Sequence, residues 1–180
     1  MDFINNLNTE AKIALGLVIA EKMFDNIGVE ERGYNTGREA LNSCWKWLEG
    51  KKIDADDLCN YIDSEDYIDV AEFANREKDI KKRYVWYSVL DAVSYTIYQA
   101  YKKEKRKFVP QVVEVIDDET LRILGENAIE SGYIKIESLN DVKRYLLENY
   151  SLNDTVQANN FIKKDSLPLI LETEVKFKWR

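Results

Sequence analysis

The strongest chemical feature of this sequence is a run of acidic side chains between Ile53 and Asn75 that contains no Lys or Arg. Its eight carboxylates are Asp54, Asp56, Asp57, Asp63, Glu65, Asp66, Asp69 and Glu72. A stretch of one sign repels itself and attracts a partner that brings positive charge. Tyr61, Tyr67 and Phe73 lie within the run and could supply apolar contact area. The alternative interpretation is a solvated helix face, which is the commoner origin of an acidic run.

Catalytic and metal-binding chemistry finds little support in the sequence. The chain has no histidine, which excludes Ser-His-Asp and Cys-His mechanisms and the commonest zinc sites. The loop at residues 33–38 lacks the Gly-Lys-Ser/Thr ending of a phosphate-binding loop, so we interpret it as a helix start. The acidic run also lacks the glycine of a calcium loop. We therefore predict no cofactor, no metal and no enzymatic activity; an enzyme that uses a metal held by Asp and Glu alone is the least favoured alternative.

The composition indicates one globular domain in a reducing compartment. The chain has 180 residues, 45% of them hydrophobic, and only 2 Pro and 7 Gly. Its net charge of −7 disfavours binding to nucleic acid, which needs a basic surface. The apolar run at residues 13–20 is too short to span a bilayer, so we expect no membrane contact and a cytoplasmic location. Cys44 and Cys59 are expected to be buried thiols rather than a disulfide.

The predicted fold class is mainly α: a single-domain helical bundle of six or seven helices with a short extended C-terminal segment. Helices are expected at residues 11–26, 35–48, 54–62, 69–75, 79–105, 121–131 and 140–150. Asn8 or Thr9 should cap the first of these, Asp54 the third, and Ser138 or Asn140 the last. Residues 111–116 are rich in β-branched side chains and are expected to be extended. Residues 1–150 would form the bundle and residues 151–180 an appendage, with a strand expected at 167–178.

The helix at residues 79–105 is expected to be the central one. One apolar stripe runs along it, formed by Trp86, Leu90, Val93, Ile97 and Tyr101. Tyr84, Tyr87 and Tyr98 fall partly off this stripe, so they either lie under adjacent helices or are exposed aromatics of an interface. The basic residues at 102–107 complement the negative end of the helix dipole. Of the two tryptophans in the second helix, Trp45 is expected inside and Trp47 at an edge or on the surface.

Several motifs together resemble one family of bacterial proteins. They are the helix at residues 12–24, Arg38-Glu39-Ala40, Cys44-Trp45-Lys46-Trp47-Leu48, the acidic turn at 63–66, the long helix rich in Tyr and Ala, Pro110-Gln111, Glu114, and Asp117-Asp118-Glu119. Over residues 8–135 this set is similar to the immunity proteins of polymorphic toxin systems, in the family numbered six. The resemblance implies a small, mostly helical cytoplasmic protein, encoded beside a toxin and binding the C-terminal domain of that toxin. It carries over no catalytic residue and no known binding position.

The charge pattern suggests where such a partner would bind. The predicted partner-binding residues are Asp54, Asp56, Asp57, Tyr61, Asp63, Glu65, Asp66, Tyr67, Asp69 and Glu72. Toxin nuclease domains need basic surfaces, so we expect a basic toxin domain, for example a nuclease, bound stoichiometrically by a monomer or weak homodimer. The alternative function is a cytoplasmic helical adaptor that has no toxin partner.

Overall fold

The computed structural model describes residues 2–152 and 162–167. The α-helices in this part are α1 (Thr9–Phe24), α2 (Tyr34–Leu48), α3 (Ala55–Cys59), α4 (Val70–Arg76), α5 (Ile80–Lys103), α6 (Gln111–Glu114), α7 (Asp118–Glu130) and α8 (Ile136–Asn149). Two short 3₁₀ helices, Asp2–Asn6 and Lys164–Ser166, flank them in the chain. The predicted mainly α fold class is confirmed. The described residues hold eight α-helices rather than six or seven, because the segment after Pro110 is also helical.

Two local predictions are wrong, and one lies outside the described residues. The segment at residues 111–116 is not extended: its first four residues form α6, with Val113 fully buried, so packing has overridden β propensity. Helix α8 begins at Ile136, before Ser138 and Asn140, so neither residue caps it. The strand expected at 167–178 falls almost entirely on residues outside the described ranges.

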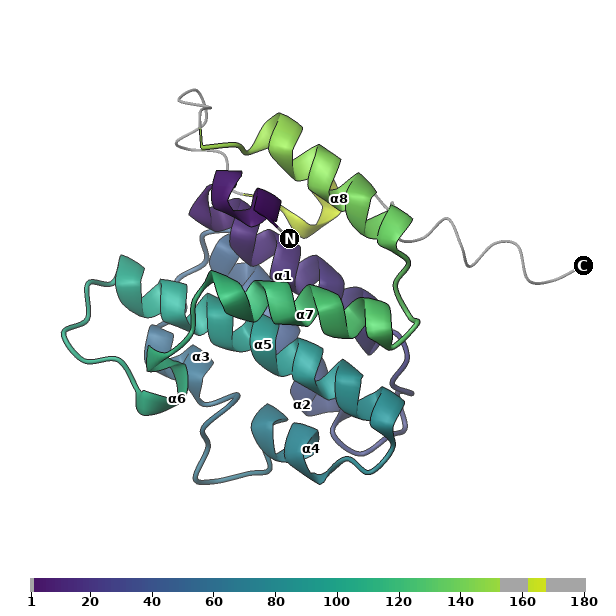
Figure 1. Cartoon of the computed structure of the whole chain (residues 1–180). Coiled ribbons are helices and arrows are strands. Elements are labelled where there is room, and N and C mark those ends of the chain that lie inside the picture. The colour runs from purple at the N-terminus through teal and green to yellow at the C-terminus, as the bar shows by residue number, and fades with distance from the viewer. Residues whose placement is uncertain (1, 153–161, 168–180) are drawn as a thin grey trace, which may run out of the picture.

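Helix α5 is the structural centre, as the apolar stripe predicted. Figure 1 shows it crossing the middle of the bundle, with α7 above it and α4 below. Its closest neighbours include α1, which approaches at Gly16. A Cβ on Gly16 would lie 3.0 Å from Leu121 Cδ2 of α7 and 3.7 Å from Ala92 Cα of α5. Helices α1, α5 and α7 therefore meet where a larger side chain would not fit.

An aromatic cluster connects α4 to this centre. The ring of Phe73 on α4 stacks on Trp86 of α5, with centroids 5.0 Å apart. Phe24 of α1 meets the same Trp86 edge-on at 5.7 Å and stacks with Tyr34 of α2 at 5.4 Å. These contacts fix the short α4, and with it the chain on either side, to three long helices.

Both tryptophans of α2 are buried, which confirms one prediction and corrects another. Trp45 is 3% exposed, and its indole N–H donates to Glu21 Oε1 at 3.1 Å. Trp47 is 8% exposed, with the Lys103 ammonium 5.0 Å from its ring centroid, so the end of α5 covers it. Cys44 and Cys59 are free buried thiols, as predicted, and burial raises the pKa of Cys44 to about 12. None of the helices in the described ranges is long and apolar enough to cross a bilayer.

Candidate protein-binding surface

The acidic run extends over α3, α4 and the loop between them, and the fold treats its carboxylates differently. Asp54 caps the N-terminus of α3, accepting from the Asp56 backbone N–H at 2.9 Å. Asp69 caps α4 in the same way. Both caps agree with helix starts expected from the sequence.

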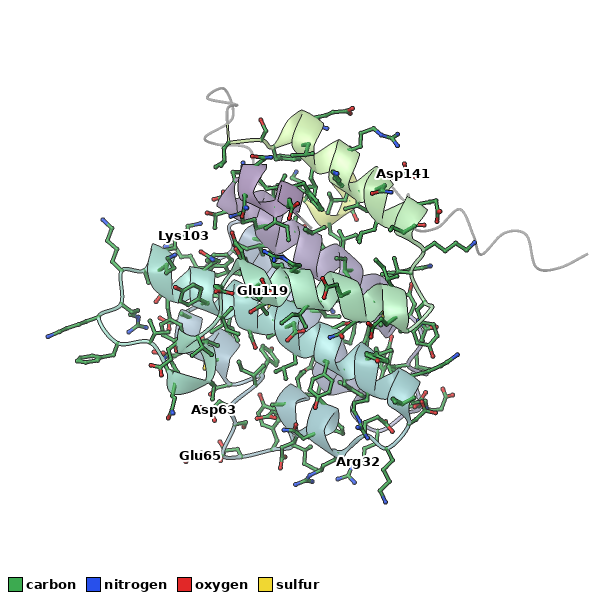
Figure 2. All side chains as sticks on the ribbon, in the orientation of Figure 1. Arg32, Asp63, Glu65, Lys103, Glu119 and Asp141 are labelled. Carbon is green, nitrogen blue, oxygen red and sulfur yellow. The ribbon has the colours of Figure 1, made fainter. Side chains whose placement is uncertain are left out.

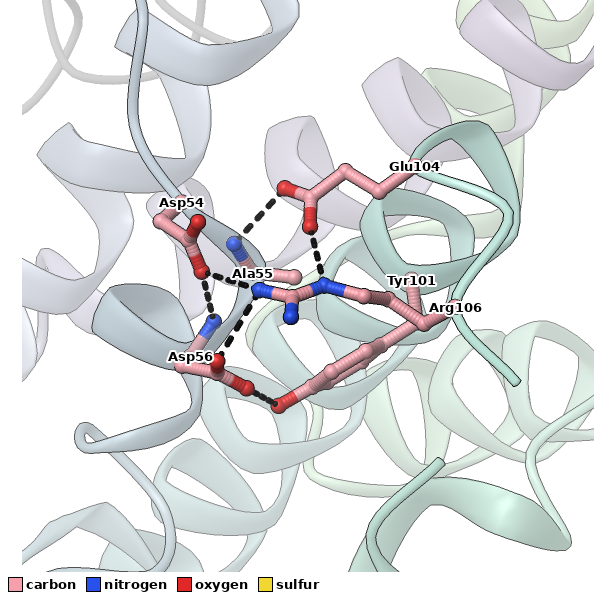
Figure 3. A network of polar contacts seen from close by, with 6 residues as sticks. All are labelled: Asp54, Ala55, Asp56, Tyr101, Glu104 and Arg106. Carbon is pink, nitrogen blue, oxygen red and sulfur yellow. Dashed lines mark hydrogen bonds and ion pairs between the residues drawn. The ribbon is translucent and has the colours of Figure 1, made fainter. Parts of the chain in front are cut away.

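Asp54 and Asp56 are held in an internal network with the C-terminal end of α5 (Figure 3). The Arg106 guanidinium lies between three carboxylates, 2.9 Å from Asp54, 3.0 Å from Asp56 and 2.8 Å from Glu104. These carboxylates raise the pKa of Arg106 further above its already high value, led by the hydrogen bond to Glu104. The Tyr101 hydroxyl donates to Asp56 Oδ1 at 2.5 Å, and Glu104 accepts from the Ala55 backbone N–H at 2.9 Å. The network therefore fixes the side chains of these two aspartates, but its one cation and three carboxylates still leave it a net charge of −2.

Asp69 and Glu72 also have internal partners. Asp69 is only 5% exposed, and its two oxygens accept from the backbone N–H groups of Glu72 at 2.9 Å and Ser64 at 3.0 Å. It therefore both starts α4 and holds the loop before it. Glu72 forms an ion pair with Arg76 one turn later, at 2.6 Å. Asp69 is therefore a structural residue, because it is buried and both of its carboxylate oxygens are hydrogen-bonded within the protein.

Six carboxylates of the run are exposed, and four of them lie outside the Arg106 network: Asp57 on α3, and Asp63, Glu65 and Asp66 on the loop. Their side chains make no ion pair or hydrogen bond with another described residue. We call residues 63–68 the acidic loop. Figure 2 shows Asp63 and Glu65 at the lower rim of the molecule. Here the negative charge is uncompensated, so a basic partner would meet it without breaking an internal ion pair.

The acidic loop is nevertheless held in place by its own hydrogen bonds. The Tyr67 hydroxyl donates to the Asn60 carbonyl at 2.7 Å, and the Asp66 backbone N–H donates to Ser64 Oγ at 3.2 Å. The Val70 backbone N–H donates to the Tyr61 carbonyl at 2.9 Å. Because these hydrogen bonds already hold the loop, binding a partner should cost little conformational entropy.

A groove lined by aromatic side chains lies beside the acidic loop. One part of it, about 460 Å³, is lined by Tyr61, Tyr67, Ile68 and Phe73 together with the polar Arg32, Thr36 and Glu39. A neighbouring part of about 320 Å³ shares Arg32, Ile68 and Phe73 with the first. Tyr67 is 45% exposed, whereas Tyr61 is half-buried, its hydroxyl 3.0 Å from Ser43 Oγ. The tyrosines of the acidic run thus border an apolar hollow rather than a flat surface.

Sequence reasoning missed two contributors to this surface. Arg32 and Ile68 line the groove, yet neither belongs to a motif in the sequence. Gly33, which has φ of +93°, makes room for the groove wall: a Cβ there would lie 2.8 Å from the Phe73 ring. The role of Arg106 was also missed. The sequence suggests only an interaction of the basic run at 102–107 with the helix dipole. In the structure, Arg106 of this run forms ion pairs with Asp54 and Asp56 of the acidic run.

The described residues offer no candidate for a metal site. Among residues 2–152 and 162–167, no group of three or more His, Cys, Asp or Glu side chains is placed to hold a metal ion. The half-buried carboxylate of Glu21 has three partners: it forms ion pairs with Arg38 at 2.6 Å and Lys164 at 2.5 Å, and it accepts a hydrogen bond from the Trp45 indole. These bonds join α1, α2 and the segment at 162–167, which is a structural role.

Comparison with known proteins gives a family. A family model described as immunity protein Imm6 matches residues 11–131. The match runs from α1 to the end of α7 and includes the acidic loop, the groove and the whole of α5. No curated protein and no solved structure matches the chain. The matched region is more than half of the 180 residues, and it agrees with the resemblance that the motifs suggested. The chain therefore belongs to the Imm6 family of immunity proteins.

Proposed function

We propose that this protein neutralises a toxin by binding the toxin's C-terminal domain in a 1:1 complex, with the acidic loop and the adjoining groove as the contact surface. The observation that carries this placement is the uncompensated charge of Asp63, Glu65 and Asp66 on a loop that is already ordered. Partner binding requires no catalytic group. The protein would act as a single helical domain, in the cytoplasm of the cell that makes the toxin, as a monomer or weak homodimer.

The partner that fits this surface is basic. Its Lys and Arg side chains would meet the exposed carboxylates, which speeds encounter and suppresses acidic competitors. An apolar side chain of the partner would enter the groove against Tyr67, Ile68 and Phe73, where desolvated contact supplies affinity. A toxin domain that acts on nucleic acid has such a basic surface, and covering it would block substrate as well.

The direct test is calorimetry with the toxin domain encoded beside this gene, at low and high salt. Replacing Asp63, Glu65 and Asp66 together by Lys should weaken binding and slow association, because attraction becomes repulsion. The matched control replaces Glu137, Asp141 and Glu148 on α8 by Lys, which changes the net charge equally on another surface. Circular dichroism of both variants checks that the helices are retained.

The outcomes are distinct. Tight binding that only the loop variant weakens supports both the function and the surface. Equal weakening by both variants would mean that net charge matters and the loop does not. If the natural chain does not bind the neighbouring toxin domain at either salt concentration, the immunity function fails for that partner and the adaptor alternative is favoured.

A further inference from the structure

One face of α5 is only partly covered by the bundle, and it carries an unusual set of side chains. Tyr84, Tyr87, Asp91 and Tyr98 are three, four and seven residues apart, which places them on one side of a helix. All four are half-buried, whereas Val85, Val89, Ala92 and Val93 around the opposite side are at most 1% exposed. We call these four residues the tyrosine face.

The neighbours of α5 show where this face opens. Helix α7 lies along one flank, where the Tyr95 hydroxyl donates to Asp118 at 2.8 Å and the Tyr84 hydroxyl reaches Glu130 at 3.4 Å. Helix α4 packs on another side of α5, where Phe73 stacks on Trp86 with ring centroids 5.0 Å apart. The tyrosine face therefore lies beside α7, and near the start of α5 it is close to α4, whose Phe73 also lines the groove beside the acidic loop.

Asp91 is the anomaly of this strip. Its carboxylate makes no hydrogen bond and no ion pair with any described residue, although it is half-buried in the middle of the central helix. Burial alone raises its pKa to about 7. Asp118 on the adjacent helix shows the usual arrangement, because it accepts from Tyr95 and pairs with Lys12 at 2.6 Å. A desolvated carboxylate without a partner costs folding free energy, and sites of that kind are commonly functional.

The surroundings of Asp91 select the chemistry of an occupant. A carboxylate accepts two parallel hydrogen bonds from a guanidinium, and Tyr87 and Tyr98, which share this side of α5 with Asp91, are aromatic groups on which a planar cation can stack. Tyr98 already accepts a cation in this way, since the Lys102 ammonium lies 5.0 Å from its ring centroid. A second copy of this chain would bring another net charge of −7 against exposed carboxylates on α7, so a basic foreign partner is the better fit.

We propose that Asp91, set among the tyrosines of α5, receives an arginine side chain of the toxin domain and forms a second contact of the complex. This inference rests on the proposed function and adds to it the chemistry of one partner residue. Helix α4 links the two contacts, because its Phe73 lines the groove and stacks on Trp86 of α5, so one toxin domain would reach both. Aromatic residues and a desolvated charge pair are the features that dominate binding energy at interfaces.

The test is the affinity of Asp91→Asn for the same toxin domain, measured by calorimetry and by association and dissociation rates. Asn keeps the size of the side chain but removes the charge, so affinity should fall roughly 30-fold or more, mainly through faster dissociation. The control is Asp141→Asn on α8, an equal chemical change at an exposed carboxylate paired with Arg144 at 2.8 Å. Its affinity should not change.

The outcomes separate this inference from the proposed function. If the natural chain binds tightly and Asp91→Asn binds equally well, the arginine contact is overturned and the immunity function stands. If the natural chain itself does not bind, the proposed function fails and this contact with it. A loss shared equally by Asp91→Asn and Asp141→Asn would also overturn the contact, because it would reflect charge alone.

Discussion

At the residue scale, some carboxylates form hydrogen bonds or ion pairs within the protein, and others have no such partner among the described residues. Asp69 accepts two backbone hydrogen bonds, and Asp54 both caps a helix and meets Arg106. Asp91 accepts nothing from the described residues, yet it lies on the best-packed helix of the bundle. Stabilising and binding roles therefore make opposite predictions about removing the charge: loss of Asp69 should harm folding, whereas loss of the Asp91 charge should help it.

Asp91→Asn is expected to stabilise the free protein near pH 8. The folded-state pKa of about 7 lies above the ordinary value of 3.8, so the folded state binds this proton more tightly than the unfolded state does. The free energy of unfolding of the natural chain should thus fall as pH rises from about 4 to about 7, then level off. At about 1.4 kcal/mol per pKa unit, reduced for partial exposure, the gain from Asn at pH 8 should be roughly 1–3 kcal/mol.

Urea unfolding of both proteins at several pH values measures this gain. The difference between them should shrink as pH is lowered towards 4, because the Asp91 carboxyl is then protonated in the folded state and partly protonated in the unfolded state. Equal unfolding midpoints at pH 8 would show that the Asp91 charge is fully solvated in the free protein, and they would remove the main reason to assign it a partner.

At the element scale, the sequence predicted helices where period and caps agreed. Asn8, Asp54, Asp69 and Asp79 accept from backbone N–H groups at the starts of α1, α3, α4 and α5, and the apolar stripe located the central helix. It failed at α6, where one turn is set by burial of Val113 rather than by propensity. For the site, the sequence predicted the acidic run but not which of its carboxylates lack an internal partner. Arg106 is about 50 residues away in sequence from Asp54 and Asp56, so their pairing could not be read from local spacing.

Asp69→Ala should loosen two elements at once. The change removes the cap of α4 and the bond that holds Ser64, so the free energy of unfolding should fall by about 1–2 kcal/mol. Limited proteolysis should then cut within the acidic loop sooner than in the natural chain. The control is Asp57→Ala, which removes an exposed carboxylate of α3 and should change stability by less than about 0.5 kcal/mol. Equal effects of the two changes would contradict the clamping role of Asp69.

At the scale of the whole molecule, the net charge of −7 is unevenly available. Near the end of α5 Arg106 balances part of it, and on α7 Arg122 pairs with Glu119, whereas the carboxylates of the acidic loop have no ion-pair partner among the described residues. We therefore expect the negative electrostatic field outside the protein to be strong near the acidic loop, where the carboxylates have no ion-pair partner among the described residues. Such a field acts over about 10 Å at 0.1 M salt and guides encounter, while short-range contacts determine how long a complex lasts.

This division predicts that salt and mutation will act on different rate constants. For the natural chain, the association rate constant with the toxin domain should fall about tenfold or more between 20 and 500 mM salt, while the dissociation rate constant changes little. The loop variant with Lys at positions 63, 65 and 66 should associate slowly at low salt and lose most of that salt dependence. Asp91→Asn should keep the salt dependence of association and dissociate faster. Stopped-flow fluorescence of the three proteins measures both rates, and association by the natural chain that is indifferent to salt would mean that its charge does not guide the encounter.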